Sequence, residues 1–257
     1  MYPTLGLYID GKWRRAEGRV SEPVINPATE QAIADLWHAS DDDLQDALAA
    51  AKRAFPKWRK VSPYDRARML RKAADLLRAR RDEVALTLTL EQGKILAESR
   101  GEVDAAADII EWAADEGRRA YGRLIAGRTS DIRQLVVPEP VGPAAAFTPW
   151  NFPAATPARK ISTALAAGCP IVIKAAEETP GTCVEIVRAF DEAGVPPGVI
   201  DLVFGKPAHV SETLIASPII RKISFTGSVP VGKHLTRLAA DGMKRVTMEL
   251  GGHSPAI

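Results

Sequence analysis

Apolar residues recur at strand spacing near the N-terminus and at helical spacing over the next hundred residues. The stretch from Leu7 to Trp13 places an Asp-Gly turn between extended residues, which is a strong β-hairpin signal. Residues 24–34 repeat this pattern with a longer turn. The segment SDDD (40–43), which is an acidic helix N-terminus, then opens a helix whose apolar face begins with Leu44 and Leu48. Three further helices are expected. One covers residues 62–77, the next ends near residue 93, and the last covers residues 96–119.

From residue 144 onwards, short apolar runs alternate with amphipathic segments of helical length. This alternation predicts an α/β protein with a Rossmann-like, doubly wound parallel sheet and helices on both faces, preceded by a mainly helical N-terminal region. Between the two parts, residues 121–140 break the pattern and predict a β arm with a strand at 133–137. The predicted strands of the sheet are 144–147, 170–174, 199–204, 222–226 and 245–250, and the helices are 156–167, 180–192, 209–216 and 228–240.

Several polar or glycine residues end these strands or closely follow them. In a parallel sheet the carboxyl ends of the strands meet at one edge, where ligands bind. We therefore expect this set to converge on one edge of the sheet. The residues are Asn151, Lys174, Gly205, Gly227 and Glu249.

Residues 147–153, with the sequence FTPWNFP, form a stiff loop. Proline fixes its own φ angle and lacks a donor, and it pushes the preceding residue towards an extended conformation. The loop therefore holds Asn151 in a fixed place. Its amide either satisfies neighbouring backbone groups or donates to a developing oxyanion.

Lys174 and Glu177 follow one apolar strand at a spacing that lets both hydrogen-bond the hydroxyls of a ribose. A solvated charge pair in a loop is the alternative interpretation. Gly227 and Ser228 join another strand to a helix, where free N–H groups and the helix dipole suit a pyrophosphate. An ordinary strand-to-helix turn is the alternative there.

Glu249 lies between Met248 and Leu250 at the end of a strand that the pattern predicts to be buried. Desolvation at such a position would raise the pKa of the carboxyl group and make it a general base. A glutamate that faces water is the alternative.

Composition narrows the choice of partners. The 257 residues contain 34 Lys and Arg against 32 Asp and Glu, so the net charge of +2 gives no reason to expect nucleic acid or a membrane surface as partner. The N-terminus shows no secretory signal, and no apolar run is long enough to span a bilayer. The two cysteines and four histidines lack metal-ligand spacing, so we predict no metal site and a cytoplasmic protein with reduced thiols.

Together, the motifs TPWNFP (148–153), KAAE (174–177), FTGS (225–228) and MELGG (248–252) resemble those of the NAD(P)-dependent aldehyde dehydrogenase superfamily. The resemblance covers essentially the whole chain, with a weaker likeness to the succinate-semialdehyde type. It implies that a cysteine attacks the aldehyde, that Asn151 holds the oxyanion, that hydride passes to the nicotinamide, and that Glu249 activates water to hydrolyse the thioester. The cofactor-binding residues expected on this basis are Thr148, Pro149, Trp150, Lys174, Glu177, Gly205, Gly227, Ser228, Leu250 and Gly251.

Two features depart from the family pattern. Ala175 stands where many relatives have proline, and the family's nucleophilic cysteine lies in a catalytic domain beyond the glutamate, which is absent from this sequence. Cys169 precedes a strand and so lies at the opposite edge, and Cys183 begins a helix on the adenosine side. Neither is expected to replace the nucleophile, so the chain alone is predicted to be inactive. The alternative is a non-catalytic nucleotide-binding or assembly module.

The resemblance also sets the expected domains and partners. Residues 1–120 are expected to pack on the nucleotide-binding domain, residues 121–140 to form a subunit-pairing arm, and residues 141–257 to form the dinucleotide-binding core. The full-length parent is expected to be a homo-oligomer that acts on a small aldehyde. A carboxylate at Glu177 would bond a free 2′-hydroxyl and repel a 2′-phosphate, which favours NAD over NADP.

Overall fold

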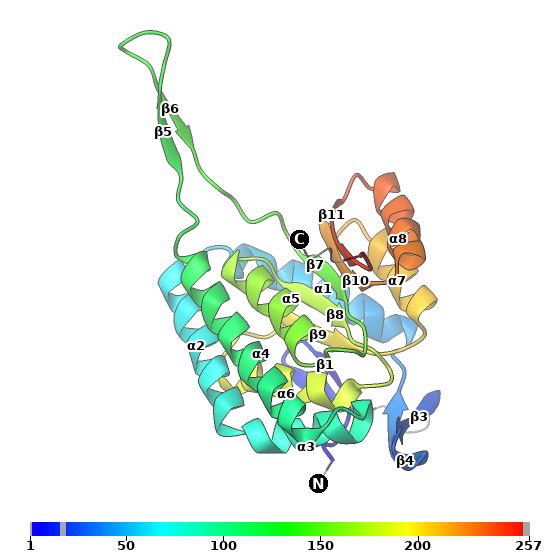
Figure 1. Cartoon of the computed structure of the whole chain (residues 1–257). Coiled ribbons are helices and arrows are strands. Elements are labelled where there is room, and N and C mark those ends of the chain that lie inside the picture. The colour runs from blue at the N-terminus through cyan, green and yellow to red at the C-terminus, as the bar shows by residue number, and fades with distance from the viewer. Residues whose placement is uncertain (1, 16–18, 254–257) are drawn as a thin grey trace.

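The computed structural model describes residues 2–15 and 19–253, and it has a seven-stranded central sheet (Figure 1). The strand order is β11-β10-β7-β8-β9-β1-β2, and the five strands from β11 to β9 run parallel. This arrangement confirms the doubly wound α/β fold. The strands of the sheet are β1 (Leu7–Ile9), β2 (Lys12–Arg14), β7 (Ala144–Phe147), β8 (Ile171–Lys174), β9 (Ile200–Val203), β10 (Lys222–Gly227) and β11 (Arg245–Leu250).

Helices cover both faces of the sheet (Figure 1). On one face α5 and α6 pack against the strands and are themselves covered by α2, α3 and α4, whereas α1, α7 and α8 cover the other face. The helices are α1 (Asp41–Trp58), α2 (Pro63–Ala79), α3 (Arg81–Gln92), α4 (Leu96–Gly117), α5 (Ala155–Ala166), α6 (Pro180–Glu192), α7 (Pro207–Ala216) and α8 (Val229–Asp241). None of the helices in the described ranges is long and apolar enough to cross a membrane.

Local sequence signals explain where several of these elements begin. Asp10 and Gly11 both have positive φ, as the two-residue turn between β1 and β2 requires. Ser40 and Asp43 form the reciprocal capping box that starts α1. The first hairpin also does more than the sequence indicated, because β1 pairs antiparallel with β9 and so extends the main sheet.

The helix α6 is capped by a residue from a distant part of the chain. Thr179 occupies the N-cap position, but its side chain makes no capping bond. Glu91 at the end of α3 accepts the N–H groups of Gly181 and Thr182 instead, each at 2.8 Å. The cap therefore comes from a distant element, which also ties α3 to α6.

Two further hairpins lie outside the main sheet. β3 (Ser21–Asn26) pairs with β4 (Gln31–Trp37), as the pattern near the N-terminus predicted. β5 (Arg123–Ala126) pairs with β6 (Arg133–Val136) in an arm that projects away from the body of the protein (Figure 1). The sequence predicted the second strand of this arm but not the first. All eight residues of these two strands are exposed.

Candidate cofactor and catalytic site

A cleft of about 410 Å³ opens at the carboxyl edge of the sheet, where β7, β8 and β10 end against α7 and α8. It contains six of the residues that the sequence assigned to cofactor binding, namely Thr148, Pro149, Trp150, Lys174, Glu177 and Gly227. It also contains residues that the sequence reasoning missed, among them Ala176, Pro207, Ser211, Phe225, Val231 and His234. Ala176 and Phe225 stand within two of the quoted motifs but were not assigned a role, whereas no motif marked the residues of α7 and α8, which reach the cleft only through the packing of the helices.

Lys174 and Glu177 form an ion pair in the wall of this cleft. Their side chains are only 7% and 14% exposed, so the pair is largely buried rather than solvated. Burial raises the pKa of the Glu177 carboxyl group, and the neighbouring Lys174 opposes this shift. Because the pair is buried at the end of a strand, its two side chains are held in a fixed geometry. Such a geometry suits hydrogen bonding to a ligand.

The loop between β7 and α5 forms another part of the wall. The backbone N–H of Thr148 donates to the carbonyl of Lys174 at 3.2 Å, which joins the two strand ends. The Thr148 hydroxyl is buried and has no hydrogen-bond partner among the described residues. Trp150 is 51% exposed and lines the cleft.

The turn from β10 to α8 contains Gly227, which packs directly against the Phe225 ring. A Cβ atom on Gly227 would lie 2.4 Å from the Phe225 ring, so only glycine fits there. Ser228 is the N-cap residue of α8, as predicted, but its side chain makes no capping bond. The unpartnered Thr148 hydroxyl and this uncapped helix start both fit the polar groups of a dinucleotide.

Asn151 lies in the same loop, outside the residues that line the cleft. Its side-chain oxygen accepts the N–H of Phe152 at 3.1 Å. No hydrogen bond among the described residues uses its amide nitrogen, and the residue is exposed. The NH₂ group is therefore the free end of the side chain, which is the orientation that an oxyanion donor needs.

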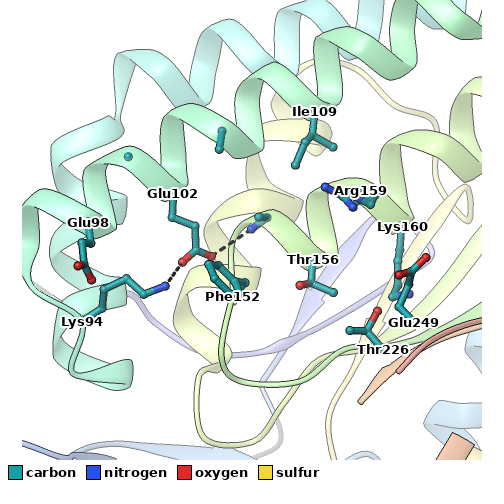
Figure 2. Close-up of a pocket in the computed structure, with 13 residues that line it drawn as sticks. Lys94, Glu98, Glu102, Ile109, Phe152, Thr156, Arg159, Lys160, Thr226 and Glu249 are labelled. Carbon is teal, nitrogen blue, oxygen red and sulfur yellow. Dashed lines mark hydrogen bonds and ion pairs between the residues drawn. The ribbon is translucent and has the colours of Figure 1, made fainter. Parts of the chain in front are cut away.

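A second cavity of about 750 Å³ lies between α4, α5 and the end of the sheet (Figure 2). Lys94, Glu102, Phe152, Arg159 and Lys160 are among its lining residues, together with Thr226 and Glu249. This cavity was not predicted from the sequence. Glu249 and Lys160 lie near each other at one end, as Figure 2 shows.

The expected burial of Glu249 is wrong. β11 is an edge strand that pairs only with β10 among the described residues, and five of its six residues are exposed, Glu249 included. The apolar residues in the sequence of this strand therefore did not indicate that Glu249 is buried. The desolvation argument for a general base finds no support in this environment.

Lys160 provides the titratable group that the sequence did not single out. Its ammonium group donates to the Ser224 hydroxyl at 2.9 Å. Burial lowers the pKa of Lys160 to about 8, and the charge of Glu249 partly opposes this shift. A change in the charge of Lys160 near neutral pH would therefore alter the electrostatic potential at Glu249.

The remaining predicted cofactor residues lie outside the lining of the cleft. Gly205 follows β9 next to His38 and Ala39, and Leu250 contacts Gly232 at the start of α8. Gly251 is exposed, and a Cβ atom placed on it would meet no other part of the protein within 4 Å. The structure thus brings Thr148, Pro149, Trp150, Lys174, Glu177 and Gly227 together in the cleft. Gly205, Ser228, Leu250 and Gly251 are not among its lining residues, although Ser228 directly follows Gly227.

Neither cysteine lines the cleft or the second cavity. Cys169 lies just before β8 at the amino edge of the sheet and is buried. Cys183 is buried in the first turn of α6, and burial, together with the nearby Glu91, raises the pKa of its thiol. Within residues 2–15 and 19–253, no group of three or more His, Cys, Asp or Glu is arranged to hold a metal ion.

The fold and this edge define a Rossmann-like α/β protein with a nucleotide-sized cleft where its parallel strands end. The sequence model of the aldehyde dehydrogenase family matches residues 13–257, and the chain belongs to this family.

Three similar proteins illustrate the relationship. The chain is 49% identical to 4-(hydroxymethyl)benzenesulfonate dehydrogenase TsaD1 of Comamonas testosteroni over 257 residues, which are 100% of this chain and 54% of that protein. It is 42% identical to the NADP(+) succinate-semialdehyde dehydrogenase GabD of Escherichia coli K12, covering 97% of this chain and 52% of that protein. The solved structure of a Staphylococcus aureus betaine aldehyde dehydrogenase variant in complex with NAD+ superimposes with a TM-score of 0.92 at 32% identity, covering 96% and 51%. The chain spans about half the length of the curated relatives it matches.

Proposed function

We propose that this chain forms the N-terminal, NAD(P)-binding portion of an aldehyde dehydrogenase, an enzyme that converts an aldehyde, NAD(P)+ and water to a carboxylic acid and NAD(P)H. The observation that carries the proposal is the cleft at the carboxyl edge, with the largely buried Lys174–Glu177 pair in its wall. Ligands bind at this edge in parallel α/β sheets. The bound NAD(P)+ supplies the hydride acceptor.

In this proposal the residues of the cleft hold the cofactor. Lys174 and Glu177 hydrogen-bond the hydroxyls of a ribose, and Thr148, Pro149 and Trp150 cover it from the β7–α5 loop. The start of α8, with Gly227 and Ser228, receives the phosphates, because free N–H groups at a helix N-terminus favour negative charge. Gly205, Leu250 and Gly251, which do not line the cleft, would contribute to cofactor binding only through the shape of the surrounding backbone.

Asn151 and Glu249 take the catalytic roles in the proposal. The free NH₂ group of Asn151 donates to the oxyanion that forms from the aldehyde. Glu249 removes a proton from the attacking water, and the nearby Lys160 sets the potential around it. Since both cysteines are buried and neither lines the cleft or the second cavity, we expect the chain alone to oxidise no aldehyde.

We also infer that the aldehyde carries a negative charge. Two relatives with more than 40% identity have names that contain the words benzenesulfonate and succinate. In the second cavity Arg159 is exposed and has no carboxylate partner among the described residues, so its guanidinium group is free to bind an anion.

The β5–β6 arm is proposed to pair subunits in a homo-oligomer. Its exposed apolar residues would be covered by such pairing. A cytoplasmic location is proposed as well, because both cysteines are free and buried rather than paired.

Calorimetric titration of the chain with NAD+ and NADP+ tests the proposal and the cofactor preference together. We expect NAD+ to bind more tightly than NADP+, since Glu177 repels a 2′-phosphate. The substitution Glu177→Ala should narrow the ratio of the two Kd values by about tenfold, the effect of one hydrogen bond to a charged group.

Glu212→Ala is the matched control, because Glu212 is an exposed carboxylate of α7 that does not line the cleft and forms no ion pair among the described residues. Binding of neither nucleotide would contradict the proposed function. An unchanged ratio in Glu177→Ala would contradict only the preference for NAD.

A further inference from the structure

The loop that carries Asn151 is held by two side chains that no sequence motif singled out, Lys94 and Glu102 (Figure 2). Lys94 precedes α4, and Glu102 lies two turns into it. Their side chains are 12% and 4% exposed, and they form an ion pair at 2.5 Å. Both point from α4 and its start towards the loop between β7 and α5 (Figure 2).

Glu102 fixes the end of the loop that follows Asn151. Its Oε1 atom accepts the N–H of Ala154 at 2.8 Å and the N–H of Ala155 at 3.2 Å. The N-cap residue of α5 is Ala154, whose side chain cannot cap. The carboxylate of Glu102 therefore supplies from another helix the acceptor that α5 lacks, and its charge suits the positive end of the helix dipole.

Lys94 fixes the loop at Asn151 itself. Besides the bond to Glu102, its ammonium group donates to the backbone carbonyl of Asn151 at 3.2 Å. It also lies 4.2 Å from the centroid of the Phe152 ring, within the range of a cation–π contact. The two charged groups thus hold the loop on both sides of the Asn151–Phe152 peptide.

The direction of the Asn151 amide depends on this backbone. Its oxygen is bound to the N–H of Phe152, so any rotation of that peptide also turns the NH₂ group. We propose that Lys94 and Glu102 are positioning residues, which fix the peptide at 151–152 and thereby aim the Asn151 amide. The restraint on the loop stands on the observed contacts, whereas its catalytic purpose rests on the proposed role of Asn151.

Amide hydrogen exchange in this chain tests the restraint without any assay of activity. In Glu102→Gln and in Lys94→Met, exchange at Phe152, Ala154 and Ala155 should accelerate by about tenfold or more, because a hydrogen bond to a charged group is weakened or lost. Exchange within α6 should stay unchanged. Lys94→Arg keeps the charge and should restore protection to near the wild-type rate.

Glu98→Gln is the matched control. Glu98 lies one turn before Glu102 on α4, is exposed, and has no hydrogen bond to the loop among the described residues. Its substitution should leave exchange in the loop unchanged. Unchanged exchange in both Glu102→Gln and Lys94→Met would overturn the proposed restraint, and equal acceleration in Glu98→Gln would do the same.

The catalytic purpose is tested in a polypeptide that also includes the other half of the relatives' length. Glu102→Gln should lower kcat by about tenfold to a hundredfold, less than the full loss of an oxyanion donor, and leave the Kd for NAD+ unchanged. Faster loop exchange with an unchanged kcat would overturn the positioning role. A wild-type protein that oxidises no aldehyde would refute the proposed function, whereas the exchange rates would still decide on the restraint.

Discussion

Asp201 on β9 is a fully buried carboxylate that the proposed chemistry does not use. Its Oδ1 atom accepts the N–H of Asp10 at 2.8 Å, whereas its Oδ2 atom has no hydrogen-bond partner among the described residues. Burial raises the pKa of Asp201 to about 7, and the backbone N–H of Asp10 only partly offsets the shift. Asp201 therefore links the first hairpin to the sheet, but its carboxyl group is buried with one oxygen atom that has no partner among the described residues.

The raised pKa makes folding stability depend on pH. Between the ordinary value near 4 and about 7, the folded protein holds a proton on Asp201 that the unfolded chain has released, so stability falls as pH rises through this window. Asp201→Asn removes this slope. The free energy of unfolding of the variant, relative to wild type, should therefore rise by about 2–4 kcal/mol from pH 4 to pH 7.5.

Urea unfolding at a series of pH values measures this difference. Asp46→Asn, which alters an exposed carboxylate of α1, should show no comparable trend. A difference between Asp201→Asn and wild type that is constant with pH would show that Asp201 is already ionised at pH 4.

Some features of single residues could be predicted from the sequence alone, and others could not. The positions of Lys174, Glu177 and Gly227 at strand ends were predictable, because the ends of parallel strands share an edge. The exposure of Glu249 could not be predicted, because an edge strand and a central strand can have the same pattern of apolar residues. Lys94 and Glu102 gave no signal, because their importance arises from contacts with residues about 50 positions away.

At the scale of elements, the hairpin arm formed by β5 and β6 is the least covered part of the chain. Leu124 and Leu135 face each other across the two strands and are each 71% exposed. A two-stranded hairpin has little stability of its own in water. An apolar hairpin that projects in this way suits pairing with another chain.

The substitution Leu135→Asp should therefore reduce self-association without unfolding the body of the protein. We expect light scattering after gel filtration to show a smaller mass than for wild type, with a melting temperature within a few degrees of wild type. Gln134→Asp places the same charge on the opposite face of β6 and is the control. Equal masses for Leu135→Asp and wild type would contradict a role of this face in pairing.

The element boundaries followed the sequence closely where local signals were strong. The capping box at Ser40, the proline at Pro63 and the left-handed Gly93 mark helix ends that the structure confirms. The first strand of the arm was missed because its four residues show no alternation of apolar and polar positions. The cap of α6 by Glu91 was missed because it bridges elements that are about 90 residues apart.

At the scale of the whole molecule, the candidate functional residues gather at the carboxyl edge of the central sheet. Its carboxyl edge holds the cleft with Lys174 and Glu177, and next to it lies the cavity that Glu249 and Arg159 line. The sequence predicted this architecture and the site's edge, since both follow from the alternation of strands and helices. It did not predict that the first hairpin extends the sheet beside β9, because no local pattern encodes a pairing across some 190 residues.

The central claim is that a dinucleotide occupies the cleft at the carboxyl edge. A titration of the isotope-labelled chain with NAD+, followed by two-dimensional NMR of its backbone amides, tests this most directly. We expect the amide signals of Thr148, Ala176, Glu177, Gly227 and Val231 to shift and those of the arm and α2 to stay in place. Shifts that are absent at saturating NAD+, or that cluster away from the cleft, would contradict the claim.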